Sequence, residues 1–250
     1  MKRNIKSALY LLRRVLVPWK QKTRGLVLAY HSVRYAPEDV FSITPEAFER
    51  QCEMIRADGF TVVPLSTIEH MLAREVPART IVITFDDGRR DNYEYAFPIL
   101  KRFGYHATVF SITDCIGGSI PTSSGPVPAL SVDQMKEMQQ SGLIDFEPHT
   151  ASHTSLTQVP LSEAREQVSR SKSTLERMLS KPCPYFSYPH GKYSGDIQKI
   201  LADSGIRLAF STASGFVTPQ SDTLALARNG VDRTTTGAEF RGILAHGRIR

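Results

Sequence analysis

Two adjacent carboxylates, Asp86 and Asp87, directly follow a β-branched apolar run at 80–85 and precede Gly88. The run is typical of a buried strand. Neighbouring residues inside a strand point to opposite faces, so two aspartates share one site only where the strand ends, and Gly88 permits the turn this requires. Strand carboxyl ends are where α/β folds bind ligands. The segment therefore predicts a polar site, although Asp-Asp-Gly also occurs as a simple turn.

Two histidines, His149 and His153, follow a second strand-like segment at 143–148. At this spacing they can lie on one side of a helical turn and bind one metal ion. Two neutral imidazoles and a carboxylate give three ligands, which leaves a catalytic zinc one open position for water. Surface histidines also recur at this spacing by chance, so the pair carries weight only together with the Asp-Asp-Gly segment.

Three motifs follow one another in the order of a known family: Thr-Phe-Asp-Asp-Gly at 84–88, His-Thr-Ala-Ser-His at 149–153 and Phe-Ser-Tyr-Pro-His-Gly at 186–191. The chain resembles the polysaccharide deacetylases (NodB-homology domain, carbohydrate esterase family 4) over roughly residues 25–245. Leu-Ala-Tyr-His-Ser-Val at 28–33 is similar to the branch that deacetylates poly-N-acetylglucosamine in biofilms. The resemblance implies an α/β fold, a distorted, incomplete (β/α)7 barrel, with one catalytic domain at 25–250 after a segment at 1–24.

The resemblance also implies roles for the first two motifs. Asp87, His149 and His153 are expected to bind a divalent metal, and Asp86 is expected to be the general base. A bound metal lowers the pKa of its water and polarises the carbonyl that is attacked. Zinc is the default expectation, although cobalt, nickel, iron or manganese also suit one carboxylate and two imidazoles.

The general acid is predicted to be His31, which ends the strand expected over 25–33 and titrates in the right range. In many relatives this histidine comes from a late motif, whereas the biofilm branch has it near the start. His246 is the late candidate here, but it lies among glycines and arginines close to the end of the chain. A hydrogen-bonded core histidine is the competing interpretation of His31.

The third motif departs from the family. Ser187 stands where many relatives carry an arginine that orients the base, and serine supplies no guanidinium fork. Arg228 and Arg233 are the suggested replacements. His190 replaces a tyrosine, but the oxyanion is expected to be bound by a backbone N–H, which His190 also has. A fourth metal ligand and a sugar contact are the other interpretations of His190.

The sugar is predicted to contact Tyr30, Tyr188, Pro189 and Gly191. The two tyrosines offer stacking surfaces, and packing in the core is the competing interpretation for each. His70 and His106 are interpreted as structural.

Strands and helices are predicted to alternate along the chain, which indicates a parallel α/β fold. Helices are expected at 45–58, 66–73, 92–103, 131–141, 162–180, 194–204 and 237–246, with Thr44, Ser66 and Ser162 as helix-capping residues. Further strands are expected at 61–64, 107–112, 184–188, 208–211 and 224–231. The glycine- and proline-rich loop at 114–130 is longer than most connections, so it is predicted to be either a rim over the site or a surface insertion.

The positive charge of the chain, +6, has a local origin. Residues 1–24 hold eight of the 31 basic residues and no acidic one, which leaves 23 basic against 25 acidic residues elsewhere. We therefore expect no nucleic-acid partner. Residues 5–17 have helical periodicity with a basic rim, and the alternatives for residues 1–20 are a helix on an anionic membrane surface, a helix packed on the domain and a cleaved signal peptide.

Other features concern the cell compartment. Three dispersed cysteines make no disulfide framework and no thiolate zinc site, and no apolar run is long enough for a membrane span. We expect the protein in the cytoplasm or on the inner face of the membrane, with export to the periplasm or cell envelope as the alternative. The sequence gives no oligomeric state.

The predicted function is metal-dependent removal of N-acetyl groups from N-acetylhexosamine units of a polysaccharide or lipid-linked saccharide. One alternative is hydrolysis of a different C–N bond in the same fold, such as deformylation of a lipid-linked aminosugar. The other is a non-catalytic saccharide-binding relative, which the missing arginine would favour. Release of acetate or formate separates the first two, and metal content separates the third.

Overall fold

A parallel sheet forms the centre of the computed structural model, which describes residues 24–248 except 75 and 78. β5 (Thr80–Phe85) pairs along its whole length with β1 (Gly25–Tyr30) and near its end with β6 (Ala107–Ser111). β9 (Ile144–Pro148) pairs with β6, and β12 (Asn229–Gly230) pairs with β1. All residues of β1 and β5 are buried, as expected for parallel strands covered on both faces.

A separate two-stranded parallel sheet extends the central sheet into an open ring of seven parallel strands. β10 (Tyr185–Ser187) pairs with β11 (Leu208–Phe210), and Leu226 then bridges β11 in parallel just before β12 returns to β1. No ladder joins β9 to β10 within the described residues. The ring is therefore joined by a single bridge on one side and open at a seam on the other, which confirms the predicted incomplete barrel.

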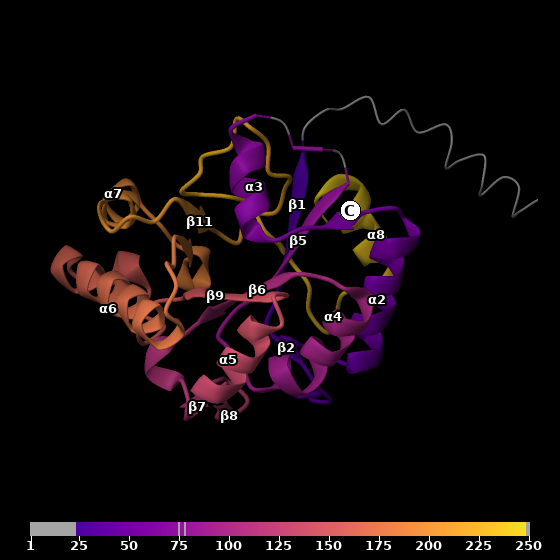
Figure 1. The fold of residues 1–250 in the computed structure, drawn as a ribbon, viewed down its shortest axis with the longest axis horizontal. Coiled ribbons are helices and arrows are strands. Elements are labelled where there is room, and N and C mark those ends of the chain that lie inside the picture. Colours follow the sequence, from indigo (N-terminus) through magenta and orange to yellow (C-terminus); the bar gives the residue numbers. More distant parts are fainter. Residues whose placement is uncertain (1–23, 75, 78, 249–250) are drawn as a thin grey trace, which may run out of the picture.

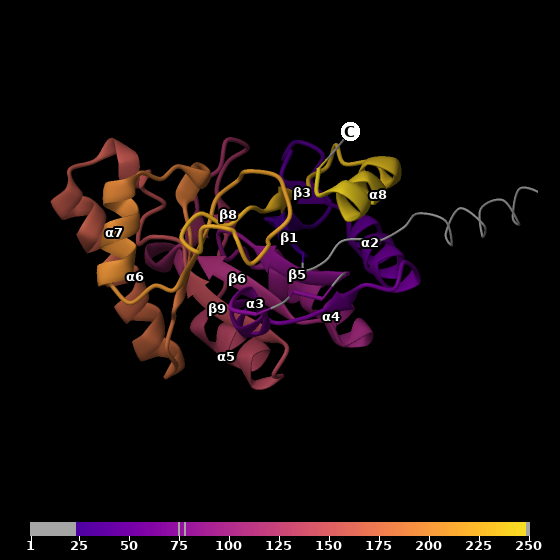
Figure 2. The same ribbon diagram turned by 90° about the horizontal axis from the view of Figure 1, so that it is seen from above.

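Helices surround the sheet on both sides (Figures 1 and 2). Their bounds are α2 Pro45–Ala57, α3 Leu65–Leu72, α4 Phe97–Phe103, α5 Val132–Gln140, α6 Leu161–Leu179, α7 Gly195–Asp203 and α8 Gly237–His246. α6 and α7 lie beside β9 and β11, whereas α2, α4 and α8 lie at the opposite end near β1 and β5 (Figure 1). Apolar side chains of β1, β5, β6 and the helices around them form the largest core.

Short elements carry the connections. They are β2 Ser32–Val33, β3 Ser42–Ile43, β4 Thr61–Val62, β7 Ser119–Ile120, β8 Val127–Pro128, a π-helix at Asn92–Ala96 and 3₁₀ turns at Thr113–Cys115, Leu156–Gln158 and Pro189–Gly191. β7 and β8 form a hairpin inside the long 114–130 loop. β4 pairs with the first residues of β5, on the edge that β6 takes over further along.

Several helix starts differ from the sequence-based expectation. Thr44 caps α2 as predicted, accepting a hydrogen bond from the backbone N–H of Ala47. Ser66 and Ser162 are not caps, because α3 and α6 each begin one residue before the serine. Proline occupies both cap positions instead, without a side-chain hydrogen bond. The helix expected at 92–103 is a π-helical turn followed by α4.

The predicted amphipathic helix at 5–17 lies outside the described residues. Among the helices that are described, none has the length and apolar character needed to cross a membrane. The membrane-surface, packed-helix and signal-peptide interpretations of residues 1–20 thus remain predictions.

Candidate active site

The turn after β5 separates the two aspartates. The backbone N–H of Asp86 still donates to the Tyr30 carbonyl of β1 at 2.9 Å, whereas Asp87 has a left-handed backbone with φ +72°. Gly88 follows with φ +81°, and a Cβ there would lie 2.8 Å from Ser111 Oγ. The sequence therefore needs glycine at this point, and the predicted turn brings both carboxylates to the strand end.

Residues with a strained backbone are concentrated in the loops around the candidate site. Six described non-glycine residues have positive φ, and four of them are Asp87, Thr150, His153 and His190. Such conformations cost about 1–3 kcal/mol each and cluster at functional sites. The strain in the loops after β5, β9 and β10 therefore marks the strand ends where the predicted motifs meet.

Asp87, His149 and His153 converge on one point. The Nε2 atoms of His149 and His153 lie 4.0 Å and 3.7 Å from Asp87 Oδ1, and the three ligand atoms lie within 4.8 Å of one another. His149 Nδ1 lies 2.7 Å from the Ser187 carbonyl oxygen. Donation of the Nδ1 proton to that carbonyl leaves the Nε2 lone pair directed at the same point.

This donor set fits a divalent cation. Burial lowers the pKa of His149, and burial together with the neighbouring His149 lowers the pKa of His153. Both imidazoles therefore favour the neutral form that binds metals. Burial by itself would raise the pKa of Asp87, but the neighbouring His31 and Arg89 more than offset this effect, so the pKa is lowered and Asp87 stays ionised. A carboxylate and two neutral imidazoles are a typical set for a catalytic zinc site with an open position.

Arg228 holds the second carboxylate, Asp86. Its NH1 and NH2 atoms donate to the two carboxylate oxygens of Asp86, each at 2.7 Å. NH2 also donates to Ser187 Oγ at 2.8 Å, and Nε donates to the Ser211 carbonyl at 3.2 Å. Burial by itself would raise the pKa of Asp86, but the guanidinium fork of Arg228 more than offsets it and lowers that pKa. Asp86 is thus a buried, ionised carboxylate beside the predicted metal position.

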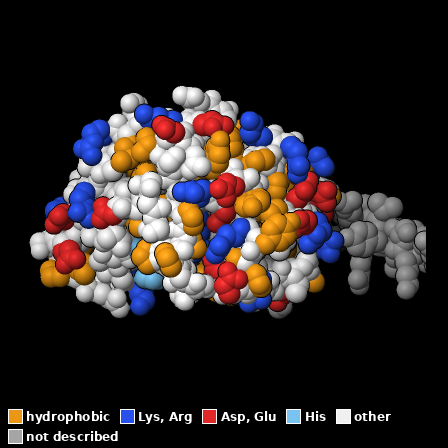
Figure 3. Space-filling view, turned by 90° about the horizontal axis from the view of Figure 1, so that it is seen from below, with side chains coloured by type: hydrophobic (Ala, Val, Ile, Leu, Met, Phe, Trp, Pro, Cys, Tyr) orange, Lys and Arg blue, Asp and Glu red, His pale blue; other side chains and the backbone are white. Residues whose placement is uncertain are grey.

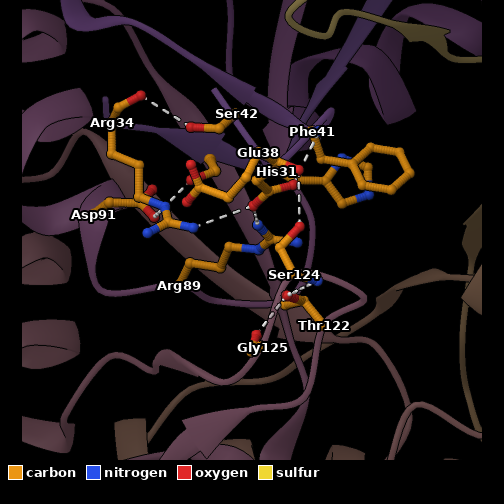
Figure 4. Close-up of polar contacts among 12 residues, drawn as sticks. His31, Arg34, Glu38, Phe41, Ser42, Arg89, Asp91, Thr122, Ser124 and Gly125 are labelled. Atoms are coloured by element: carbon orange, nitrogen blue, oxygen red, sulfur yellow. Dashed lines mark hydrogen bonds and ion pairs between the residues drawn. The ribbon is translucent and has the colours of Figure 1, made fainter. Parts of the chain in front are cut away.

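Arg89 holds the other oxygen of Asp87. Its Nε and NH2 donate to Asp87 Oδ2 at 3.1 Å and 3.0 Å, which leaves Oδ1 facing the two histidines. NH1 donates to Asp39 Oδ2 at 2.6 Å, and Figure 4 shows Arg89 reaching toward the loop that carries Glu38 and Phe41. The metal ligand is therefore tied to a loop between β2 and β3.

A cavity of about 500 Å³ lies over these groups. His31 lines it from the end of β1, with its ring packed against Phe41 at 4.6 Å between centroids (Figure 4). Pro121, Thr122 and Ser123 line the opposite wall, so the 114–130 loop forms a rim of the cavity. His31 consequently lies in the same cavity as both aspartates. His246 is exposed at the end of α8 and does not line it.

The residues of the third motif differ in how they lie relative to the cavity. His190 lines the cavity, with its ring 4.8 Å from that of His153. A Cβ on Gly191 would collide with Thr212, so glycine is required there for close approach of two loops. Tyr188 also lines the cavity, but its hydroxyl donates to the Leu224 carbonyl at 2.8 Å and its side chain is buried. Pro189 is buried in the turn between them.

Tyr30 is a core residue rather than a sugar contact. It is 1% exposed, its hydroxyl donates to Gln51 at 2.9 Å, and its ring stacks on Phe85. Because Tyr30 precedes His31 in the strand, its side chain points to the opposite face, away from the cavity. The structure thus contradicts the predicted substrate contact and supports the competing interpretation.

The sequence profile described as polysaccharide deacetylase matches residues 73–209, more than half of the 250-residue chain. The chain belongs to the polysaccharide deacetylase family. The matched segment contains Asp86, Asp87, His149, His153 and His190. His31 and Arg228 lie outside it, and the fold brings them to the family's residues.

Relatives match over most of the chain. A poly-beta-1,6-N-acetyl-D-glucosamine N-deacetylase of Staphylococcus epidermidis is 28% identical over 231 residues, which is 83% of this chain and 79% of that protein. The solved structure of IcaB from Ammonifex degensii is 27% identical, with a TM-score of 0.79, and covers 90% of this chain and 97% of that one. The deacetylase PplD of Streptococcus pyogenes, solved with acetate, is 26% identical, with a TM-score of 0.78, and covers 90% and 98%. The predicted family, fold and hydrolase class of this deacetylase are confirmed.

The sequence suggested one of the residues that hold the site and missed three others. Arg228 was one of two suggested partners for Asp86 and makes the contact, whereas Arg233 is exposed. Arg89, Asp39 and Phe41 were not considered. Arg89 had a signal in its position two residues after Asp87. Asp39 and Phe41 had none, because they lie in an irregular loop that reaches the site only through tertiary packing.

Proposed function

We propose that this deacetylase hydrolyses the N-acetyl group of N-acetylhexosamine units in a glycan. The observation that carries the proposal is the juxtaposition in one cavity of a three-residue metal-binding set, Asp87, His149 and His153, with a separate ionised carboxylate, Asp86. The name of the Staphylococcus epidermidis relative supports poly-N-acetylglucosamine as the glycan.

The chain supplies a base that is free of the metal set. When bound by Asp87, His149 and His153, a divalent metal supplies Lewis acidity and lowers the pKa of water. Asp86 accepts the proton of the attacking water, and Arg228 keeps that carboxylate ionised and fixed in orientation. The backbone N–H of His190 is the proposed hydrogen-bond donor to the oxyanion that forms.

His31 is the proposed general acid. It reaches the cavity from β1, the strand next to the one that ends in Asp86, and the Phe41 ring covers one of its faces. In that position its proton can pass to the departing amine while Asp86 takes one from water. A His31→Gln variant is expected to bind metal normally and to lose about 10²-fold or more in kcat.

A non-catalytic role has less support from the site than from the sequence. That alternative rested on the absence of an arginine at Ser187. In the fold, Arg228 supplies the guanidinium from the segment before β12, and it bonds both Ser187 and Asp86. The group that many relatives take from the third motif thus has a substitute here.

The direct test uses β-1,6-linked N-acetylglucosamine oligomers, with acetate release and product mass as readouts. Each turnover by the metal-loaded enzyme is expected to remove one acetyl group from the oligomer and to release acetate rather than formate. Asp87→Ala and His149→Ala are expected to abolish turnover and to lower bound metal while the melting temperature stays close to that of the wild type. Undiminished turnover by either variant would refute the assignment.

Zinc is the proposed metal. The set of one carboxylate and two imidazoles suits zinc and also cobalt, nickel, iron and manganese. Reconstitution of metal-free protein with each ion, followed by elemental analysis of protein purified from its own cells, tests the choice. A different ion in the purified protein would contradict it.

We also propose that residues 1–20 hold the enzyme on the inner face of the membrane. The support is the basic composition of residues 1–24 and the apolar periodicity at 5–17. The full chain is expected to sediment with anionic lipid vesicles, and a variant lacking residues 1–23 is expected to stay in solution. A mature amino terminus cleaved near residue 20 would instead favour export.

A further inference from the structure

A second cavity, of about 300 Å³, is lined by segments that also contribute to the active-site cavity. It is lined mainly by Arg34, Tyr35, Arg90, Asp91, Glu94 and Tyr95. None of these side chains belongs to the catalytic set. A volume of this size is at the lower end for pockets that bind small ligands.

Three segments line both cavities. Asp39 and Phe41 face the active site, whereas Arg34 and Tyr35 of the same loop face the second cavity. Residues 121–123 of the β7–β8 hairpin line the first cavity, and residues 127–128 line the second. In the turn after β5, Arg89 faces one cavity and the next residue faces the other. The two cavities are therefore neighbours separated by a single layer of chain.

The separating layer is held by hydrogen bonds that Figure 4 displays. Arg89 NH1 donates to Asp39 Oδ2 at 2.6 Å, and Ser124 Oγ donates to the Glu38 carbonyl at 2.9 Å. Together they join the hairpin, the loop between β2 and β3, and the turn after β5.

Part of the second cavity is pre-formed. Asp91 is buried, and its carboxylate accepts hydrogen bonds from Ser32 Oγ at 2.7 Å and from the Val33 N–H at 2.9 Å. Arg34 donates to Asp39 at 3.3 Å. These contacts fix the floor of the cavity before any ligand arrives, which lowers the ordering cost of binding.

The rim of the second cavity has an exposed aromatic character. Tyr35 is 63% exposed and Tyr95 is 38% exposed. Of the six large hydrophobic residues that are exposed among the described ones, these two and Val40 and Phe41 lie on segments around the two cavities. Figure 3 shows hydrophobic side chains gathered among basic and acidic ones on the face seen from below. Aromatic faces beside charged hydrogen-bonding groups match a sugar ring, which has apolar C–H faces and a belt of hydroxyls.

We propose that the second cavity is a sugar-binding subsite for another unit of the same glycan chain whose N-acetyl group lies at the metal site. Tyr35 and Tyr95 contact the faces of the sugar ring, and Arg90 and Glu94 hydrogen-bond its hydroxyls. The proposal rests on the proposed function, because it takes the ligand to be the glycan substrate. Such a subsite makes the enzyme more efficient on long glycan chains than on short ones.

The test compares kcat/KM on the dimer and the hexamer of β-1,6-linked N-acetylglucosamine. Wild type is expected to prefer the hexamer, and Tyr95→Ala and Arg90→Ala are each expected to lose about tenfold on the hexamer through KM, with the dimer unchanged. Leu161→Ala is the matched control, because Leu161 is 51% exposed at the start of α6 and lines neither cavity. Equal losses on both oligomers, or no loss on either, would overturn the subsite.

A binding arm separates failure of this inference from failure of the proposed function. If wild type releases no acetate from any oligomer, the proposed function fails. Calorimetric titration of the metal-loaded protein with the hexamer then decides about the subsite. About tenfold weaker binding by Tyr95→Ala than by wild type supports the subsite. Equal affinity of the two proteins, or no binding by wild type, overturns the subsite, and the second cavity would then not be a glycan-binding site.

Discussion

Asp86, directly after β5, and Glu147, on β9 of the same sheet, are both buried carboxylates, yet they are in opposite ionisation states. Asp86 is 4% exposed, and Arg228 contacts both of its oxygens at 2.7 Å, which lowers its pKa. Glu147 is 1% exposed on β9, and burial raises its pKa to about 8 although Lys181 lies 3.7 Å away. Burial alone thus protonates a carboxyl group, and a bidentate guanidinium reverses the effect.

The difference follows the position of each group in the open barrel. Asp86 lies at a strand end in the cavity, where a base has to be ionised. Glu147 lies at the seam between β9 and β10, where no ladder pairs the backbone groups, and its Oε2 accepts a hydrogen bond from the Tyr185 N–H at 3.0 Å. Lys181 is held closer to the more exposed Asp145, at 2.7 Å. Asp86 is thus kept ionised as a base, whereas Glu147 accepts a hydrogen bond from a buried backbone N–H.

Removal of the guanidinium should make Asp86 resemble Glu147. Arg228→Met is expected to lower kcat by about 10²–10³-fold, because the buried base loses its counter-ion and its orientation. In wild type the depressed pKa of Asp86 keeps the base ionised through neutral pH. In the variant, burial raises that pKa, so the acid limb of the pH–rate profile is expected to move toward neutral pH.

Arg228→Lys is the control for this change. It keeps the positive charge but not the two-point contact, so its kcat and the shift of its acid limb are expected to be intermediate. A profile of Arg228→Met with the same acid limb as wild type would show that the arginine does not set the ionisation of Asp86.

Arg89 orients Asp87 in the way that Arg228 orients Asp86. Loss of its contacts to Oδ2 leaves the metal ligand free to rotate, so Arg89→Gln is expected to weaken metal affinity by about 10–100-fold. Competition with a chelator at a temperature where the variant is folded measures this directly. Arg90→Gln is the control, because the adjacent arginine faces the other cavity. Equal metal affinity of Arg89→Gln and wild type would contradict the proposed positioning.

The metal set was proposed from local sequence patterns, whereas the partner of Asp86 was narrowed only to Arg228 or Arg233, and Arg89, the partner of Asp87, was not considered. A strand ending in Asp-Asp-Gly and a strand followed by His-x-x-x-His are local patterns, and parallel strand ends meet at one edge. Arg228 reaches Asp86 from 142 positions away because β12 pairs with β1, which in turn pairs with β5. That register is set by tertiary packing. The sequence therefore showed that the third motif lacks the arginine and suggested two replacements, and the fold selects Arg228.

Helix starts illustrate a smaller limit. Serine has a strong preference for helix caps, which favoured Ser66 and Ser162. In the structure Pro64 and Pro160 precede the first turns, where their fixed φ suits an extended cap residue, and the serines lie inside the helices. Tyr30 was misassigned for a related reason, since alternation along a strand shows that neighbours face opposite ways but not which one faces the cavity.

Glu147, the carboxyl group at the seam between β9 and β10, gives the smallest expected effect on activity and, through a change in stability, the sharpest test of the comparison. Glu147 keeps its proton up to a pKa of about 8 in the folded protein, above the ordinary value of 4.5. Between these two values the unfolded chain releases the proton and the folded chain does not, so stability falls as pH rises through this window. Glu147→Gln retains an acceptor for the Tyr185 N–H without this cost. It is therefore expected to be more stable than wild type by on the order of 4 kcal/mol at pH 8, with the difference vanishing near pH 4.5.

Denaturant unfolding across this pH range measures the difference, and Asp145→Asn is the matched control. Asp145 pairs with the same lysine from a more exposed position, and exposed pairs contribute about 0–1 kcal/mol, so this variant is expected to show little change with pH. If Glu147→Gln were instead less stable than wild type at pH 8, Glu147 would be ionised and paired with Lys181 in the folded protein. The seam would then follow the same rule as the Asp86–Arg228 pair, and a single lysine at 3.7 Å would be enough to overcome burial.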